Sequence, residues 1–277
     1  PYCDFNSHVR ESIDYSAWLS AFKAELDYYK NNSSNEISKN KIETIFFGGG
    51  TPSLMPASLI SEILAYIDLN FKFSNNIEIT LEANPGSSEA EKFRDFKKAG
   101  INRISVGVQS LDDKRLKFLG RKHNSKEALN AMNYAAEIFG RFSFDFIYAT
   151  PDQKFENWLD ELKQALKFNP KHLSLYQLTI EKGTQFYRDY LKNKITMPKD
   201  DDSENFYLKT VEFLKDNMLE QYEVSNFAVL GEECRHNMTY WRYDDYLGIG
   251  PGAHSRISIN GDKYAIFNHH SPEKYIE

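Results

Sequence analysis

The fold class follows from one segment, Glu43-Thr44-Ile45-Phe46-Phe47-Gly48-Gly49-Gly50-Thr51-Pro52-Ser53. Its first part is rich in β-branched and aromatic residues, as in a β-strand, and its glycines form a turn. Similar runs recur along the chain, and apolar residues between them have the helical period. This alternation predicts parallel strands joined by crossover helices, in a doubly wound sheet or a complete or partial barrel. The predicted strands are 43–47, 77–82, 102–108, 141–148, 172–179 and 221–225.

Length and composition narrow the class of protein. The 277 residues suit one large α/β domain with an appendage. The formal charge of −6 argues against non-specific binding to nucleic acid or anionic lipid. Only two cysteines are present, so we expect free thiols or ligands rather than a disulfide framework. No secretory or transit signal is visible, which favours the cytoplasm.

The ends of the chain suggest a segment of a longer protein. The predicted helix at 15–30 has no strand before it, so we expect the first strand upstream of Pro1. After residue 225 the periodicity gives way to Gly, His, Tyr and Trp. We therefore predict a barrel domain over 1–225 and a truncated C-terminal region over 226–277.

Candidate ligand-binding residues follow the first two predicted strands. Gly49 and Gly50 let backbone groups approach a ligand, and Thr51 adds a hydroxyl, although the same residues also suit a plain turn. Glu82 ends the second strand, where a carboxylate can accept hydrogen bonds from the vicinal hydroxyls of a ribose. An exposed strand-end glutamate is the alternative.

The next two strands carry further polar residues. Gln109 follows the third strand, and Arg121 is suited either to a ligand carboxylate or to a nearby aspartate, Asp112 or Asp113. Asp145 interrupts an apolar strand, which costs several kcal/mol unless the carboxylate is paired or faces a polar lumen. A barrel lumen favours a functional role for Asp145 over a buried structural pair.

The aromatic segment 226–254, with its histidines and glycines, suits a flat apolar ligand or a rigidly packed loop. Cys3 on its own is typical of an inert thiol. A metabolic enzyme that binds phosphate with the glycine loop is the simplest alternative, but it leaves the order of the motifs unexplained.

Together these motifs resemble the radical S-adenosylmethionine proteins related to oxygen-independent coproporphyrinogen III oxidase, and within them the HemW haem chaperones. The matching segments, in order, are Pro-Tyr-Cys at 1–3, Phe-Gly-Gly-Gly-Thr-Pro-Ser at 47–53, Glu-Ala-Asn-Pro at 82–85, Gly-Val-Gln-Ser at 107–110, Leu-Gly-Arg at 119–121 and Asp-Phe-Ile-Tyr at 145–148. The resemblance implies a partial (β/α)6 TIM-type barrel with an appended C-terminal region.

The resemblance also implies cofactors and the residues that bind them. Cys3 matches the last cysteine of a CxxxCxxC motif that binds a [4Fe–4S] cluster, and the other two are absent from the chain. The residues implied to surround S-adenosylmethionine are Tyr2, Gly49, Gly50, Thr51, Glu82, Gln109, Arg121 and Asp145. If the chain were complete, reductive cleavage of S-adenosylmethionine would fail; if it is a segment of a longer protein, the full protein would keep the cluster.

Two features favour the chaperone branch over the oxidase branch. The oxidase has a further cysteine where this chain has Phe5, and residues 236–240 resemble the HNxxY element whose histidine is implicated in holding haem. We therefore expect His236 to bind haem, which would be passed to haem-requiring respiratory proteins, some of them membrane-associated. Radical decarboxylation of coproporphyrinogen III is the alternative. We expect no nucleic-acid partner, and a homodimer is compatible with the sequence.

Overall fold

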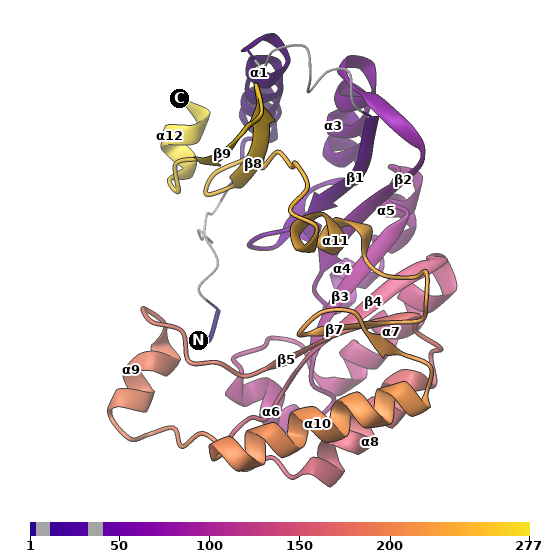
Figure 1. Cartoon of the computed structure of the whole chain (residues 1–277), viewed down its shortest axis with the longest axis vertical. Coiled ribbons are helices and arrows are strands. Elements are labelled where there is room, and N and C mark those ends of the chain that lie inside the picture. The colour runs from indigo at the N-terminus through magenta and orange to yellow at the C-terminus, as the bar shows by residue number, and fades with distance from the viewer. Residues whose placement is uncertain (4–11, 33–40) are drawn as a thin grey trace.

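The computed structural model describes residues 1–3, 12–32 and 41–277. Its main feature is a curled sheet, open on one side, with helices on the convex face (Figure 1). The strands lie in the order β1-β2-β3-β4-β5-β7-β6, and β1 to β5 are parallel. Their bounds are β1 Lys41–Phe47, β2 Lys72–Ala83, β3 Arg103–Gln109, β4 Arg141–Tyr148, β5 His172–Gln177, β6 Glu220–Gln221 and β7 Asn226–Ala228. The predicted α/β partial barrel is confirmed.

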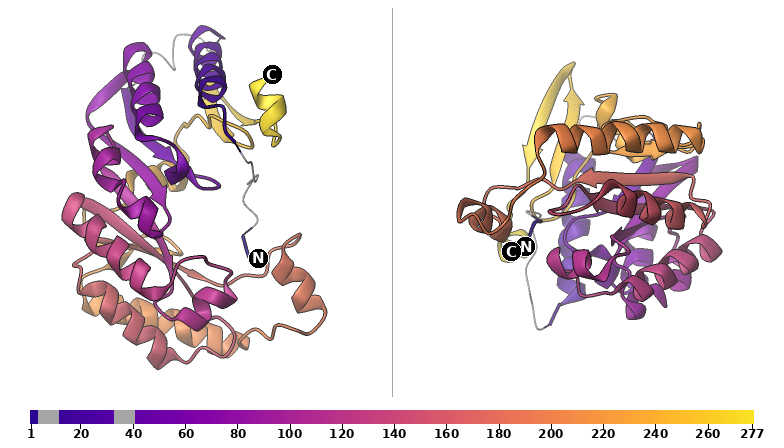
Figure 2. Two further views of the ribbon diagram at one scale, coloured as in Figure 1. Left: turned by 180° about the vertical axis from the view of Figure 1, so that it is seen from behind. Right: turned by 90° about the horizontal axis from the view of Figure 1, so that it is seen from below.

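Helices join the parallel strands and cover the outside of the sheet, as the purple to pink helices of Figure 2 show. Apolar outward-facing residues such as Leu81, Val106 and Phe146 pack there against Met132 and Trp158. The helices are α1 Tyr15–Asn32, α3 Ala57–Asn70, α4 Ser87–Ala90, α5 Phe93–Lys98, α6 Asp113–Phe118, α7 Ser125–Ile138, α8 Phe155–Leu166, α9 Gln185–Leu191 and α10 Asp200–Asp216, with a short 3-10 helix η1 at Pro52–Leu54.

The inner face of the sheet is polar. Because side chains alternate between the two faces of a strand, the residues between the apolar ones face the lumen. They include a buried ionic and polar group near the start of the strands and carboxylates near their carboxyl ends. In strand order the inward residues are Thr44, Phe46, Glu78, Thr80, Glu82, Arg103, Ser105, Ser143, Asp145, His172 and Ser174. This polar lining is what a ligand-binding barrel interior requires.

The predicted sixth strand at 221–225 is wrong. Residues 222–225 form a turn, in which the Glu223 carboxylate accepts hydrogen bonds from the Ser225 N–H and the Asn226 side chain. The chain then reverses, so β7 lies antiparallel between β5 and β6. A local side-chain to backbone bond thus interrupts a run that had strand composition.

The C-terminal part of the chain contacts the first strands. It consists of α11 Arg235–Trp241, the hairpin of β8 His254–Ile259 and β9 Asp262–Phe267, and α12 Pro272–Ile276. Trp18 and Phe22 of α1 pack on Tyr275 of α12, and α11 lies against β1 (Figure 1). The proposed domain division after residue 225 stays a prediction. In the described ranges, no helix combines the length and the apolar character needed to cross a bilayer.

Candidate functional site

The glycine turn after β1 meets the carboxyl end of β2. The Gly49 N–H donates a hydrogen bond to the Glu82 carboxylate. Gly49 has φ +106°, a conformation that favours glycine. A Cβ at Gly48 would lie 3.0 Å from the Phe46 ring and 3.4 Å from Glu82 Oε1, so this turn is closely packed on both residues. Thr51 Oγ1 donates to the Gly50 carbonyl, 2.7 Å away, which holds the end of the turn.

Glu82 is poised between its charged and neutral forms near neutral pH. Burial, together with the nearby Asp145 carboxylate, raises the pKa of Glu82 to about 7, although the Gly49 N–H opposes the rise. A ligand that donates hydrogen bonds to this carboxylate would stabilise its charged form. The two hydroxyls of a ribose have that chemistry.

Gln109 and Arg121 meet over Gly107 at the end of β3. A Cβ at Gly107 would lie 2.9 Å from Gln109 Nε2 and 3.6 Å from Arg121 Nη2, so a side chain there would displace the end of Gln109 and touch Arg121. Gln109 itself has φ +65°, which is uncommon for a residue with a Cβ. Such strained backbone is found at functional sites.

Arg121 bonds to the barrel rather than to the aspartates that the sequence offered. Its Nη2 donates to Asn84 Oδ1, 2.5 Å away, and to the Gly107 carbonyl, 3.3 Å away. Its Nη1 lies 3.5 Å from the Tyr2 hydroxyl. Asp112 instead caps α6, and Asp113 accepts from the Ser125 N–H. The guanidinium is therefore held at the mouth of the barrel.

The opening residues of the chain lie beside this arginine. The Pro1 carbonyl accepts from the Phe186 N–H of α9 at 3.1 Å, and the Tyr2 ring lies 6.3 Å from the Phe186 ring. Burial raises the pKa of Tyr2, against the opposing effect of Arg121. Cys3 is exposed, close enough to Tyr2 to influence that pKa. Phe5 falls outside the described residues.

Asp145 lies deeper in the lumen. Ser105 Oγ is 2.9 and 3.1 Å from its two carboxylate oxygens, and Ser143 and Ser174 also donate to it. Burial raises the pKa of Asp145, while these serines and Arg103 act in the opposite direction. The carboxylate is solvated by hydroxyls rather than held in a close ion pair.

The residues present do not fit a three-thiolate cluster by themselves. Cys3 is beside the mouth, whereas Cys234 is buried against Glu78, with Sγ 3.6 Å from Oε1, at the other end of the strands. No group of three or more metal-binding side chains occurs in the parts of the chain that the structure covers. The chain thus supplies one thiolate at the mouth.

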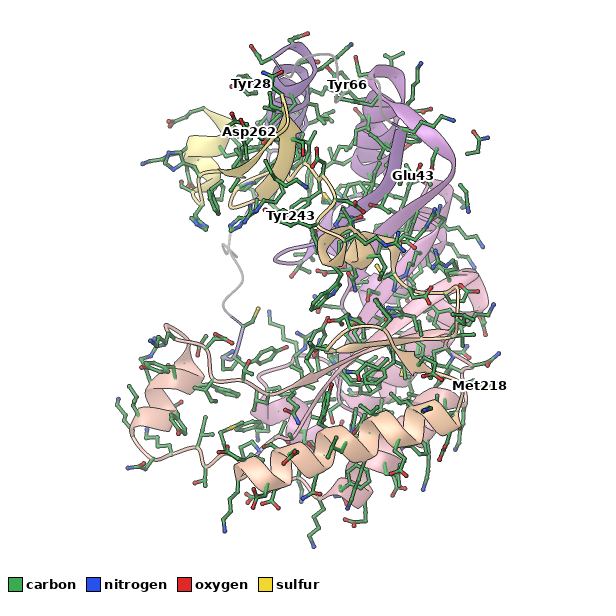
Figure 3. The ribbon with its side chains drawn as sticks, viewed as in Figure 1. Tyr28, Glu43, Tyr66, Met218, Tyr243 and Asp262 are labelled. Carbon is green, nitrogen blue, oxygen red and sulfur yellow. The ribbon has the colours of Figure 1, made fainter. Side chains whose placement is uncertain are left out.

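His236 lies on α11, against the inner face of β1. Its Nδ1 is 2.9 Å from Thr44 Oγ1, its Nε2 is 2.7 Å from the Tyr240 hydroxyl, and its ring stacks on Phe46 at 4.9 Å. Burial lowers the pKa of His236 to about 4, so the imidazole is neutral at neutral pH. Tyr243, labelled in Figure 3, follows α11 in the chain.

Buried polar groups hold α11 on the barrel. The Glu78 side chain is 0% exposed; it bonds to Arg141 at 2.5 Å, and Oε1 accepts from the His236 N–H at 3.3 Å. Asn237 donates to the Tyr222 hydroxyl at 3.1 Å, and that hydroxyl lies 2.8 Å from His172 Nε2.

The sequence analysis missed several of these residues. Thr44 and Phe46 were assigned only to a strand, and Glu78, Arg103 and Tyr222 received no role. For Thr44, Phe46, Glu78 and Arg103 the signal is the period of two along each strand, because they share the inward face with the predicted site residues. Tyr222 lies between β6 and β7 and has no such signal.

Comparison with known proteins identifies the family. Residues 1–165 match the model of the radical SAM superfamily. The chain is 43% identical over 266 residues to heme chaperone HemW of Haemophilus influenzae, across 94% of this chain and 67% of that protein. This chain belongs to the HemW family of the radical S-adenosylmethionine superfamily. The resemblance inferred from the motifs is therefore confirmed.

Two further relatives match over the same share of the chain. HemW of Escherichia coli is 39% identical, and the mitochondrial radical S-adenosyl methionine domain-containing protein 1 of Danio rerio is 37% identical, each over 94% of this chain. The chain spans 67% of the first and 58% of the second. The structure of coproporphyrinogen III oxidase (HemN) from Escherichia coli aligns with a TM-score of 0.79 at 22% identity, covering 99% of this chain and 64% of that one, which shows the shared fold.

Proposed function

We propose that this HemW-family protein is a haem chaperone, which binds haem at His236 and passes it to haem-requiring respiratory proteins. The observation that carries the proposal is the neutral imidazole of His236, fixed against β1 in a chain 43% identical to a named heme chaperone. Imidazole is a common axial ligand of haem iron.

The surface beside His236 suits a flat apolar ligand. Tyr240, Trp241 and Tyr243 are 47, 57 and 66% exposed, which is unusual for aromatic residues so close together in the chain. Lys263 Nζ lies 4.4 Å from the centre of the Tyr243 ring and 2.9 Å from Asp245 Oδ1, so an ion-paired cation borders the aromatic surface. These four residues and His236 form the proposed haem surface.

The barrel mouth is proposed to hold S-adenosylmethionine, and its residues fit the nucleoside part of that molecule. Glu82 would accept the ribose hydroxyls, the Gly49–Thr51 turn would line the methionyl side, and Gln109 and Arg121 would close the far wall over Gly107. Burial and the Asp145 carboxylate together keep the pKa of Glu82 near 7. The Tyr2 hydroxyl lies 3.5 Å from Arg121 Nη1. Cys3 would be one of the ligands of a [4Fe–4S] cluster, which would supply electrons for the chemistry of S-adenosylmethionine.

Haem titration tests the proposed function. Absorbance of the wild-type protein is expected to show a saturable Soret shift, whereas His236→Ala should weaken binding at least about tenfold because the axial ligand is lost. His269→Ala is the matched control, since His269 is an exposed histidine outside the haem surface and its loss should change nothing. An identical titration for His236→Ala would remove that residue from the proposal.

An anaerobic assay separates the rival function. Gln109, Arg121 and Asp145 match residues of the oxidase, so decarboxylation of coproporphyrinogen III by cluster-reconstituted full-length protein would favour an enzyme over a chaperone. We expect no product. The proposed partners are haem and haem-accepting client proteins, the proposed location is the cytoplasm, and size-exclusion chromatography with haem present tests the proposed dimer.

A further inference from the structure

The two ring nitrogens of His236 have different surroundings. Nδ1 faces Thr44 on β1, inside the fold. Nε2 faces the hydroxyl of Tyr240, whose side chain is 47% exposed. A ligand arriving from solvent can therefore reach Nε2 but not Nδ1.

We propose that Tyr240 is a displaceable latch on Nε2 of His236, and that Thr44 is the positioning residue that keeps Nε2 unprotonated for haem iron. This inference rests on the proposed function and adds to it how the haem ligand is guarded and oriented. In the free protein the Tyr240 O–H donates to Nε2, and Nδ1–H donates to Thr44 Oγ1. When haem binds, the iron takes the Nε2 lone pair in place of the hydroxyl.

The geometry lets Tyr240 move while His236 stays fixed. Tyr240 lies one helical turn after His236, near the end of α11, and packs edge-on to Tyr246 with ring centres 4.7 Å apart. Half-exposed side chains change rotamer readily. His236 is held on three sides, by Thr44, by the stacked Phe46 ring and by the Glu78 carboxylate on its own N–H.

The proton balance selects one tautomer. Haem iron needs a nitrogen with a free lone pair, so the ring proton must be on Nδ1. Thr44 Oγ1, 2.9 Å away, is placed to accept it. A hydrogen bond from the other ring nitrogen fixes the orientation of a metal-bound histidine and strengthens it as a ligand. Binding therefore releases no proton from His236, and the freed Tyr240 hydroxyl turns to solvent.

The latch is tested with Tyr240→Phe, which keeps the ring and removes the hydroxyl. Haem should bind about fivefold more tightly, with faster association, because no hydrogen bond has to be broken first. Tyr264→Phe is the matched control, since Tyr264 is also 47% exposed but lies on β9. Unchanged or weaker binding by Tyr240→Phe would overturn the latch, and weaker binding would indicate that the hydroxyl itself contacts haem.

Thr44 is tested by its effect on the bound iron. Thr44→Val should lower haem affinity about tenfold and lower the iron–histidine stretching frequency of the ferrous complex, while Thr44→Ser restores both. A role in folding alone would leave that frequency unchanged, and an unchanged frequency overturns the assignment. If the wild-type protein binds no haem, both the proposed function and the latch are wrong. If the wild-type protein binds haem but the Tyr240 and Thr44 variants do not change binding as expected, only the latch is wrong and the haem function stands.

Discussion

Replacing Glu78 with alanine is expected to lower the free energy of unfolding by about 3–5 kcal/mol. The Glu78 side chain is fully buried and ion-paired to Arg141, with Arg235 Nε 3.9 Å away. Arg103, which is 2% exposed, is also close to Glu78: burial opposes the charged form of Arg103, but neighbouring groups that include Glu78 raise its pKa. Alanine would remove this buried carboxylate from beside the three arginines, and Arg141 would keep its ion pair with Glu232, at 3.1 Å.

Chemical denaturation measures this loss. Glu62→Ala, on the exposed face of α3, is the control and should change stability by less than about 0.5 kcal/mol. Glu78→Gln keeps the side-chain volume and one acceptor oxygen and should be milder, so it provides a folded variant if Glu78→Ala does not fold. Because Glu78 also accepts the His236 N–H, Glu78→Gln should weaken haem binding. A loss below about 1 kcal/mol for Glu78→Ala would contradict the structural role.

Replacing Glu82 with glutamine is expected to weaken binding of the adenosyl group about 30- to 100-fold. Each hydrogen bond to a charged group is worth about 1.5–3 kcal/mol, and glutamine, which lacks one of the two acceptor oxygens, would lose about one such bond. Calorimetry with 5′-methylthioadenosine isolates this contact, because that molecule has the ribose but not the amino acid part that a cluster would bind. The 2′-deoxy analogue of this molecule is the control. The loss of affinity that the missing hydroxyl causes should nearly vanish in Glu82→Gln. If the missing hydroxyl lowers affinity as much in Glu82→Gln as in the wild-type protein, the ribose does not contact Glu82.

The raised pKa of Glu82 predicts a pH dependence for the same binding. With a pKa of about 7, the carboxylate is about one-tenth ionised at pH 6, so affinity for methylthioadenosine should be about tenfold lower there than at pH 8. In the free protein, stability changes with pH in the opposite direction to ligand affinity. The folded state binds this proton more tightly than the unfolded state, so stability should fall as pH rises from about 4.5 to 7. Glu82→Gln should remove both trends.

The sequence was a good guide where one local pattern determines the structure. Alternating strands and helices predicted the curled sheet, because a parallel strand needs a helical crossover. The glycine turn and Glu82 were both predicted as ligand-binding residues at strand ends, and they are neighbours because the carboxyl ends of parallel strands share one edge. The prediction of a strand at 221–225 was wrong, because the Glu223 side chain stabilises a turn at which the chain reverses. The hydrogen bond from the Ser225 N–H to the Glu223 side chain spans only two residues, so it does not change the hydrophobic pattern from which the strand was predicted.

The surroundings of the site residues were harder to predict than the residues themselves. Thr44 and His236 are 192 positions apart, and their contact depends on how α11 enters the barrel. The alternative that Arg121 pairs with Asp112 or Asp113 was wrong for the same reason, because the observed partner Asn84 is more remote in sequence than Asp112. Sequence spacing identifies neighbours within a helix or strand but not across the lumen.

Haem transfer is the measurement that tests the central claim most directly. Protein loaded with ferric haem would be mixed with the apo form of a haem-requiring respiratory enzyme, and the Soret band and the recovered activity followed over time. We predict that haem moves and activity returns faster than with the same amount of free haem, and that Tyr264→Phe behaves like wild type. Haem that stays bound, or activity that returns no faster than with free haem, would contradict a chaperone role.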